Sequence, residues 1–513
     1  MSRYAYLFLL FLSGFPNVQA QLEGGGARVA AEVPERELRG VWLATVLNID
    51  YPSLATPDAT TLKLEFREKL TALRKVGFNT LFVQVRPAGD ALYPTELAPW
   101  SQWLTGRQGS PPVPADFDPL AFMIEEAHAQ AVELHAWVNP YRLTMSLDTF
   151  NLAPNHLFHQ RRDWVRQYGS RLYLDPGLPE VRRHLGQVIA ELVSNYDLDG
   201  IHFDDYFYPY PIPGEVFPDE PTYFRYGRGR ALGDWRRSNV DQFVAETYNR
   251  IKTAKPWMQF GISPYGVWRN RAQDPLNGSD SQASVSSYDD LYGDAIGWAQ
   301  RGHVDYLIPQ LYWSIDFPPA SHATLARWWA QSTPSPTRLY VGHAAYKVTA
   351  NPEPAWNDPQ ELPRQVRLNR RTPRLSGSVY FSAKSILQNS FGLLQNLSRQ
   401  YATPSLFPER TAPATAPLVP VATKVYKPKA TEKGKLIVWE IDKNLPEQQV
   451  PHYFAVYRST GKGERELIHR SPFGLSCRRF HYYDTDATPG VAYDYFVIPV
   501  DRYHRKLTTP VAR

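Results

Sequence analysis

Short apolar runs alternate with amphipathic segments along most of the chain. Eight runs have the nearly continuous apolar character of strands buried on both faces: residues 38–45, 80–86, 132–139, 199–206, 260–265, 304–313, 339–345 and 378–382. Each is followed by a segment that fits a helix, from Leu62, Phe66, Leu70, Leu73 and Val76 at helical spacing to a last helix over about residues 385–401. Strands that alternate with helices in this way form parallel sheets.

The number of these units favours a closed barrel. Eight strand–helix units over residues 37–402 predict an α/β fold, a (β/α)8 TIM barrel of the usual size once insertions are counted. An open, doubly wound sheet is the alternative, which the count of eight disfavours. The long connections follow the second to fifth strands, so we expect the insertions on the C-terminal face, where barrel enzymes carry their active sites.

The composition changes after residue 402. Residues 403–430 are rich in Pro, Ala, Thr and Lys, which is typical of a linker. Residues 431–513 contain strand-like runs separated by turns, without a helical pattern, and predict a small all-β sandwich that resembles a fibronectin type III module. Its acidic residues are scattered, so no chemistry is assigned to it.

The N-terminus has the features of a targeting segment. Arg3, an apolar stretch over residues 4–15 and small residues at 18–20 predict a signal peptide over residues 1–20, followed by a flexible segment over 21–36. A transmembrane anchor is disfavoured because the apolar stretch is shorter than the ~20 residues that span a bilayer. We therefore expect an exported protein that is periplasmic, at the cell surface or extracellular. Cys477 is the only cysteine, which excludes an internal disulfide.

Charge and composition narrow the class of partner. The net charge of +5 is small for 513 residues, and no basic stripe suits nucleic acid. Aromatic residues make up 13% of the chain, with 14 Trp and 31 Tyr, and such rings suit a surface that stacks on sugar faces. We expect a polysaccharide substrate, no nucleic acid partner, no stable membrane insertion after signal cleavage and no cofactor.

The fourth apolar run carries the strongest chemical signal, because it ends in the adjacent carboxylates Asp204 and Asp205. On a regular strand their side chains would point to opposite faces, so both serve one ligand only if the strand ends there. Two nearby carboxylates raise the pKa of one of them, which gives an acid and a base at neutral pH. Hydrolysis of a glycosidic bond needs such a pair of roles.

Several segments in the same order carry a family resemblance: residues 37–42, 48–50, 52–53, 77–80, 83–86, 137–140, 199–206, 261–264 and 309–313. In these segments the chain resembles the glycosyl hydrolase-like 10 family of exported bacterial barrel proteins. The resemblance implies a glycosidase barrel that acts on bacterial or environmental glycans, with peptidoglycan strands among the suspected substrates. Membership of a family does not by itself establish the substrate.

The adjacent pair also resembles that of substrate-assisted glycosidases, in which the acetamide of an N-acetylated sugar is the nucleophile. The resemblance implies Asp205 as general acid and Asp204 as the carboxylate that orients the acetamide, with the reverse order open. In related chitinase-like barrels a tyrosine after strand six contacts the acetamide, and Tyr312 occupies that place. We expect substrate contacts from strand ends and the loops after them: Gln84, Arg86, Asn139, Tyr206, Tyr265, Trp268, Gln310, Tyr312 and Trp313.

Other interpretations stay open. The pair is structural if it binds an arginine such as Arg86, and a conventional mechanism would recruit a remote acid: Asp50, Asp90, Asp290 or Asp316. His202 beside the pair hints at a metal-dependent deacetylase, but the spacing is no recognised metal signature. The strand-end amides can equally bind the barrel's own backbone, and His135, His202, Trp42 and Trp137 are expected in the core. A non-catalytic envelope protein that only binds glycan is the alternative from another class.

Overall fold

The computed structural model describes residues 33–442, 445–446, 450–461, 463–474 and 477–508. The predicted signal peptide and residues 21–32 of the predicted flexible segment lie outside the described residues. From Glu35 onward the chain forms one compact unit. Within the described ranges, no helix combines the length and the apolar character needed to cross a membrane.

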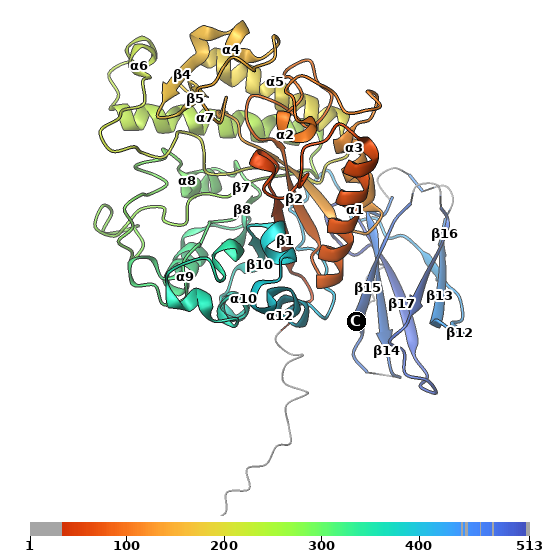
Figure 1. The fold of residues 1–513 in the computed structure, drawn as a ribbon. Coiled ribbons are helices and arrows are strands. Elements are labelled where there is room, and N and C mark those ends of the chain that lie inside the picture. The colour runs from red at the N-terminus through yellow and green to blue at the C-terminus, as the bar shows by residue number, and fades with distance from the viewer. Residues whose placement is uncertain (1–32, 443–444, 447–449, 462, 475–476, 509–513) are drawn as a thin grey trace, which may run out of the picture. The chain divides into compact units, whose positions relative to one another are not determined.

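The predicted (β/α)8 barrel is confirmed (Figure 1). Its eight strands pair in parallel around a closed ring, in the order β1, β10, β9, β8, β7, β6, β3, β2. They are β1 (Leu38–Leu43), β2 (Thr80–Arg86), β3 (Glu133–Val138), β6 (Gly200–Phe203), β7 (Gln259–Ile262), β8 (Tyr306–Leu307), β9 (Arg338–His343) and β10 (Leu375–Tyr380). β8 is shorter than the predicted run because Pro309 lacks an N–H, and Gln310 then rejoins its neighbours through isolated bridges to Tyr265 and Gly342.

Helices surround the barrel, and their ends follow local sequence signals. The longer ones are α1 (Ala59–Val76), α3 (Pro119–His128), α5 (Pro179–Asn195), α7 (Leu232–Ala254), α9 (His322–Ser332), α10 (Glu361–Arg371) and α12 (Leu393–Gln400), with the short α8 (Ala295–Gln300) after β7. The Asp58 side chain caps α1 by accepting from the backbone N–H groups of Thr60 and Thr61, and Gly77 ends it at φ 109°.

The last predicted helix is interrupted. Instead of one helix over about residues 385–401, the structure has α11 (Ala383–Leu387), the 3-10 turn η7 (Ser390–Gly392) and α12. Asn389 and Phe391 have φ values of 57° and 50°, and Gly392 one of 67°. Left-handed residues cannot continue an α-helix, so the chain restarts at Leu393.

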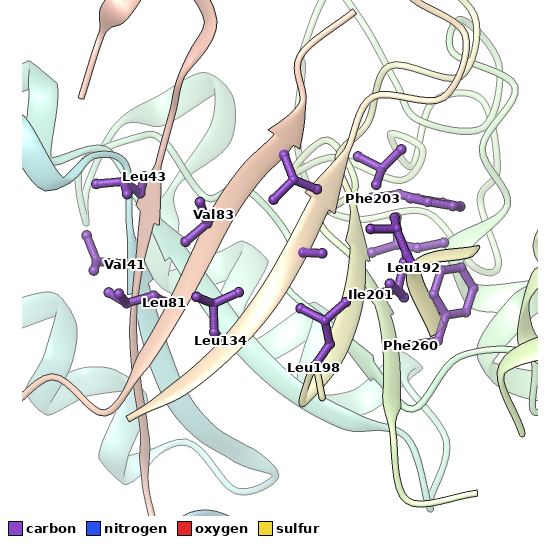
Figure 2. Packing of buried hydrophobic residues seen from close by; sticks show 14 of the residues in the cluster. Val41, Leu43, Leu81, Val83, Leu134, Leu192, Leu198, Ile201, Phe203 and Phe260 are labelled. Carbon is purple, nitrogen blue, oxygen red and sulfur yellow. The ribbon is translucent and has the colours of Figure 1, made fainter. Parts of the chain in front are cut away.

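Alternate residues of the strands divide between two apolar layers. Val41, Leu81, Leu134 and Ile201 belong to the large core between strands and helices, which also contains Leu192 of α5 (Figure 2). The barrel interior holds a second cluster: Leu38, Trp42, Ala44, Phe82, Trp137, Tyr306, Ile308, Tyr340 and Val379. The sheet is therefore buried on both faces, as the continuous apolar runs predicted.

Predicted core histidines lie inside the barrel. His202 Nε2 is 3.1 Å from Trp42 Nε1 and 3.1 Å from Ser263 Oγ. His135 Nδ1 is 2.9 Å from the Tyr306 hydroxyl. Burial holds the pKa of His202 well below its usual range, so it is neutral at physiological pH. Both rings therefore support the interior of the barrel.

The connections after β2, β3, β6 and β7 are the long ones, and each leaves the C-terminal end of its strand. They contain α2 (Gln102–Thr105), then α4 (Leu157–Gln160), η3 (Arg162–Trp164) and the hairpin of β4 (Val165–Tyr168) and β5 (Arg171–Leu174), then α6 (Glu220–Tyr226). Short 3-10 turns lie at η2 (Val46–Asn48), η4 (Pro318–Ala320), η5 (Ala345–Lys347) and η6 (Pro354–Asn357). The mouth of the barrel is thus built mainly by inserted segments.

The C-terminal part consists of two antiparallel sheets. One contains β11 (Thr423–Val425), β12 (Lys429–Thr431), β13 (Gly434–Ile441) and β16 (Arg479–Asp484), and the other β14 (Tyr453–Ser459), β15 (Glu466–Pro472) and β17 (Asp494–Val500). Trp439, Phe454 and Phe480 pack between the sheets. β11 and the start of β12 lie within residues 403–430, because three-residue edge strands leave little signal in a Pro- and Lys-rich stretch.

Candidate active site

The adjacent carboxylates lie just beyond the end of β6. The strand ends at Phe203, and Asp204 and Asp205 follow in a bend with 5% and 3% of their surface exposed. Because the chain has left the pleat, both side chains reach one cavity of about 400 Å³ at the C-terminal end of the barrel. The cavity is also lined by Trp42, Gln84, Trp137, Arg142, Met145, Arg171, Tyr206, Tyr210, Ser263, Gln310, Tyr312, Tyr346 and Phe381.

Asp204 is held by three donors. Asn139 Nδ2 donates to Oδ2, Trp137 Nε1 donates to the same oxygen at 3.3 Å, and the backbone N–H of Tyr206 donates to Oδ1 at 3.1 Å. Burial raises the pKa of Asp204, while these donors and the charge of Arg142 oppose the rise. The three donors all hydrogen-bond to the Asp204 carboxyl oxygens and so fix the orientation of this side chain beside the cavity.

A second amide fixes the orientation of Asn139. Gln84 Nε2 donates to Asn139 Oδ1 at 2.6 Å, and Gln84 Oε1 accepts from the backbone N–H groups of Thr45 and Val46 at 3.0 Å each. These bonds assign oxygen and nitrogen in both amides and leave Asn139 Nδ2 directed at Asp204. The β1–β2–β3 side of the mouth therefore positions the carboxylate through a fixed chain of hydrogen bonds.

Asp205 has the environment of a proton carrier. The Tyr210 hydroxyl donates to Oδ2, and Gln310 Nε2 donates to Oδ1 at 3.1 Å. Burial and the neighbouring charge of Asp204 raise the pKa of Asp205 to about 7. The two carboxylates thus differ in environment, and Asp205 is the one that holds a proton near neutral pH.

The structure brings some of the predicted substrate-binding residues into the cavity and leaves others outside its lining. Gln84, Tyr206, Gln310 and Tyr312 line it, and Asn139 lies behind Asp204. The other four lie elsewhere in the described structure: Arg86 is buried with Nη1 3.4 Å from the Tyr93 hydroxyl, Tyr265 packs edge-on to Trp313, and Trp268 stacks on Trp328. Trp42 and Trp137 are buried as predicted, and both also form part of the cavity wall.

The candidate remote acids have other surroundings. Asp50 accepts from Ser382 and from two backbone N–H groups, Asp90 accepts from Gln108 at 3.3 Å, and Asp290 accepts from the backbone N–H of Ser286 at 2.7 Å. Asp316 is exposed. In the described part of the chain, the carboxylates that line the cavity are Asp204 and Asp205.

Tyr210, Arg142 and Arg171 are among the cavity residues that were not predicted from the sequence. Tyr210 belongs to an aromatic stretch, residues 206–210, whose ring density gave no indication of which hydroxyl meets Asp205. Arg142 follows β3 by four residues, and Arg171 begins β5 in the inserted hairpin. Only the fold of the insertion brings both arginines to the cavity of the Asp pair.

A cluster able to hold a metal ion lies at the other end of β3. Glu133, His452 and His504 offer ligand atoms within 4.8 Å of one another. The cluster already contains a cation, because Arg410 Nη2 donates to Glu133 Oε1, the same oxygen that lies 2.7 Å from His504 Nε2. The guanidinium and the carboxylate form a buried ion pair, so the geometry fits a structural contact better than a metal centre.

Comparison with known proteins identifies the family of the chain. Residues 37–358 match the family described as Glycosyl hydrolase-like 10. The chain belongs to this family. It is 43% identical over 482 residues to "Glycosyl hydrolase YngK" of Bacillus subtilis (strain 168), an alignment that covers 92% of each chain. It is 41% identical over 367 residues to "Glycosyl hydrolase DigH" of Escherichia coli (strain K12), covering 67% of this chain and 82% of that one.

Family membership establishes the class of reaction. The protein is a glycosidase, a hydrolase of O-glycosyl bonds with a carbohydrate substrate, as the sequence predicted. Among solved structures, the glycoside hydrolase domain of PgaB (BpsB) from Bordetella bronchiseptica aligns with a TM-score of 0.45 at 13% identity, over 71% of this chain and 98% of that one. The acid pair at the end of β6 is the candidate catalytic centre of this glycosidase.

Proposed function

We propose that the protein cleaves glycosidic bonds in an N-acetylhexosamine-containing polysaccharide by substrate assistance, with peptidoglycan glycan strands as first choice. The observation that carries this proposal is the set of carboxylates in the cavity. Among described residues, that lining contains Asp204 and Asp205, which are adjacent in sequence, and no separate carboxylate on another strand. A conventional glycosidase places its two carboxylates on opposite sides of the scissile bond.

The environments of the two carboxylates support distinct roles. Asp205, with a pKa raised to about 7, protonates the leaving glycosidic oxygen as general acid. The acetamide oxygen of the sugar attacks the anomeric carbon as the bond to the leaving group breaks. Asp204 accepts a hydrogen bond from the acetamide N–H and stabilises the positive charge of the resulting ring. Water then opens that ring while Asp205 takes back a proton, which restores the starting state.

Aromatic walls suit the sugar ring. Tyr206, Tyr312 and Tyr346 line the cavity, and Tyr312 meets Tyr346 edge-on with ring centroids 6.0 Å apart. Ring faces bind the apolar faces of pyranoses, and hydroxyls at the ring edge hydrogen-bond polar substituents. Tyr312 is the proposed contact to the acetamide.

Export and the C-terminal module complete the proposal. We infer that residues 1–20 are a signal peptide and that the mature protein is periplasmic, at the cell surface or extracellular, where peptidoglycan is accessible. The two antiparallel sheets, with β14 between β15 and β17, support a module of the fibronectin type III kind.

Turnover on three substrates tests the proposal. Residues 21–513 are incubated with peptide-free peptidoglycan strands, chitin oligomers and a neutral glucan, alongside Asp205→Asn and Asp204→Asn. We expect cleavage of the acetamido substrates alone and its loss in both variants. Cleavage of the neutral glucan would overturn substrate assistance in favour of a conventional mechanism. If the wild type cleaves no substrate but the wild type and both variants bind glycan, the protein is better explained as a non-catalytic glycan binder.

A further inference from the structure

Two arginines line the cavity of the Asp pair without a salt bridge to any described carboxylate. Arg142 and Arg171 both face the cavity that holds Asp204 and Asp205. The ion pairs of the described residues include neither guanidinium, whereas Arg166 on the neighbouring strand β4 pairs with Asp175 at 2.8 Å. An unpaired cation in a partly enclosed site is costly unless a ligand completes it.

Arg142 is held in place, yet part of its hydrogen-bonding capacity is unused. Only 6% of its surface is exposed, and its Nη1 donates to the Pro87 carbonyl at 3.3 Å. Its Cζ lies 4.5 Å from the centroid of the Tyr206 ring, a cation–π contact that fixes the plane of the guanidinium. Its Nε is buried and has no hydrogen-bond partner among the described residues. Buried charged donors normally find partners, so Arg142 retains hydrogen-bonding capacity that no described residue satisfies.

Arg171 comes to the cavity from a separate element. It is the first residue of β5, and β5 is tied to the chain after β3 by the isolated bridge between Arg142 and Tyr173. Its side chain is half-buried, and the hydrogen bonds of the described side chains include none from its guanidinium. Both arginines lie close enough to Tyr206 to oppose the rise in its pKa that burial and the Asp pair cause.

The charges of the cavity residues favour the binding of one anionic group. In the proposed mechanism Asp205 is protonated as the general acid, so an ionised Asp204 supplies one negative charge against the two positive charges of the arginines. The site that is ready for catalysis therefore has a net positive charge, which a substrate with one negative group would neutralise. Arginine binds carboxylates through two parallel N–H donors, which gives geometric selectivity as well as attraction.

We propose that Arg142 and Arg171 form an anion subsite that binds a carboxylate on the sugar substrate, so that the enzyme selects acidic N-acetylated glycans over neutral ones. This inference rests on the proposed function for the identity of the sugar. Its chemistry requires only a carboxylate placed beside the Asp pair, such as an ether-linked lactyl group on an amino sugar.

Binding, rather than turnover, gives the decisive test. The Asp205→Asn protein is titrated calorimetrically with peptide-free peptidoglycan strands and with the same strands after reduction of their carboxylates to alcohols. We expect roughly tenfold tighter binding of the unreduced strands, the size of effect usual for a charge-assisted contact, and loss of this preference at high salt. Hydrolysis of chitin oligomers by the wild type is measured separately, so a failure of the proposed reaction is distinguished from a failure of the subsite.

Substitutions assign the preference to the subsite. In the Asp205→Asn background, Arg171→Gln should bring the ratio of the two affinities close to one, and Arg171→Lys should keep part of it. Arg107→Gln is the matched control, because it removes an exposed arginine from the loop after β2 that lies outside the cavity lining. The proposal would be overturned if Asp205→Asn bound reduced and unreduced strands with equal affinity, or bound neither measurably. An unchanged ratio of the two affinities in Arg171→Gln would overturn it as well.

Discussion

Asn139 donates a hydrogen bond from its amide to Oδ2 of Asp204 and so joins the end of β3 to the carboxylate after β6. Replacement of Asn139 by Ala removes one of the three donors to Asp204, so the carboxyl is held less firmly in its position. We expect kcat to fall roughly 100-fold with little change in KM, because a carboxylate displaced by about 1 Å no longer meets its group in the transition state. Steady-state kinetics on chitin oligomers measure both constants. Asn151→Ala, an exposed asparagine in the same insertion, is the control, and an equal loss there would contradict the role of Asn139.

The pH dependence of activity should report Asp205. Because its pKa is raised to about 7 and the acid must be protonated, kcat/KM should decline as pH rises above about 7. The Tyr210 hydroxyl donates to Asp205 and stabilises the charged form, so Tyr210→Phe should raise that pKa further. The alkaline limb of the pH–rate profile is then expected to move upward by about 0.5–1 unit.

Tyr346→Phe is the matched control for this prediction, since Tyr346 lines the cavity and makes no hydrogen bond to either Asp in the described structure. The alkaline limb of the pH–rate profile of Tyr346→Phe should stay at the wild-type pH. A downward shift in Tyr210→Phe would show that the hydroxyl does not stabilise the ionised form of Asp205.

The barrel was predictable because its signal is local and repeated. Runs such as residues 80–86 are predominantly apolar, and the Asp58 side chain and the left-handed Gly77 mark the ends of α1. The interruption at Asn389 was not visible, because left-handed φ values depend on packing that propensity does not encode. The short β11 carried too few residues to produce a pattern.

The candidate catalytic pair could be located from the sequence because both of its members follow one strand. The residues that tune it come from other parts of the chain, and the sequence shows no relation between Gln84, Asn139 and Asp204 until the barrel places β2, β3 and β6 side by side. Arg171 was missed for the same reason, since it lies in an inserted hairpin whose path depends on tertiary contacts. The signals for the fold and for the adjacent Asp204 and Asp205 therefore lie in short stretches of sequence, whereas the contacts that support this pair join residues far apart in the chain.

Asp205 should also lower the stability of the folded protein. Its pKa is raised on folding, so between pH about 4 and about 7 the folded state binds more protons than the unfolded state, and stability falls as pH rises through this window. Asp205→Asn removes this penalty. We expect the variant to be more stable than the wild type by on the order of 2 kcal/mol at pH 8 and by little at pH 4, as measured by urea unfolding. A constant difference across this range would point to packing rather than to ionisation.

The buried pair of Glu133 and Arg410 should be essential for stability. Both side chains are 4% exposed, and Arg410 Nη2 donates to Glu133 Oε1. The positive charge of Arg410, with the contacts of the surrounding histidines, outweighs burial and holds the pKa of Glu133 well below its usual range. Loss of one partner leaves the other charge buried without its main counter-charge, so Glu133→Gln and Arg410→Met should each cost about 3–5 kcal/mol in unfolding free energy. The double variant should recover part of this loss. As a control, Glu126→Gln breaks the exposed pair with Arg67 and should cost less than about 1 kcal/mol in unfolding free energy. If the losses of the Glu133 and Arg410 single variants simply add in the double variant, the two charges are not coupled.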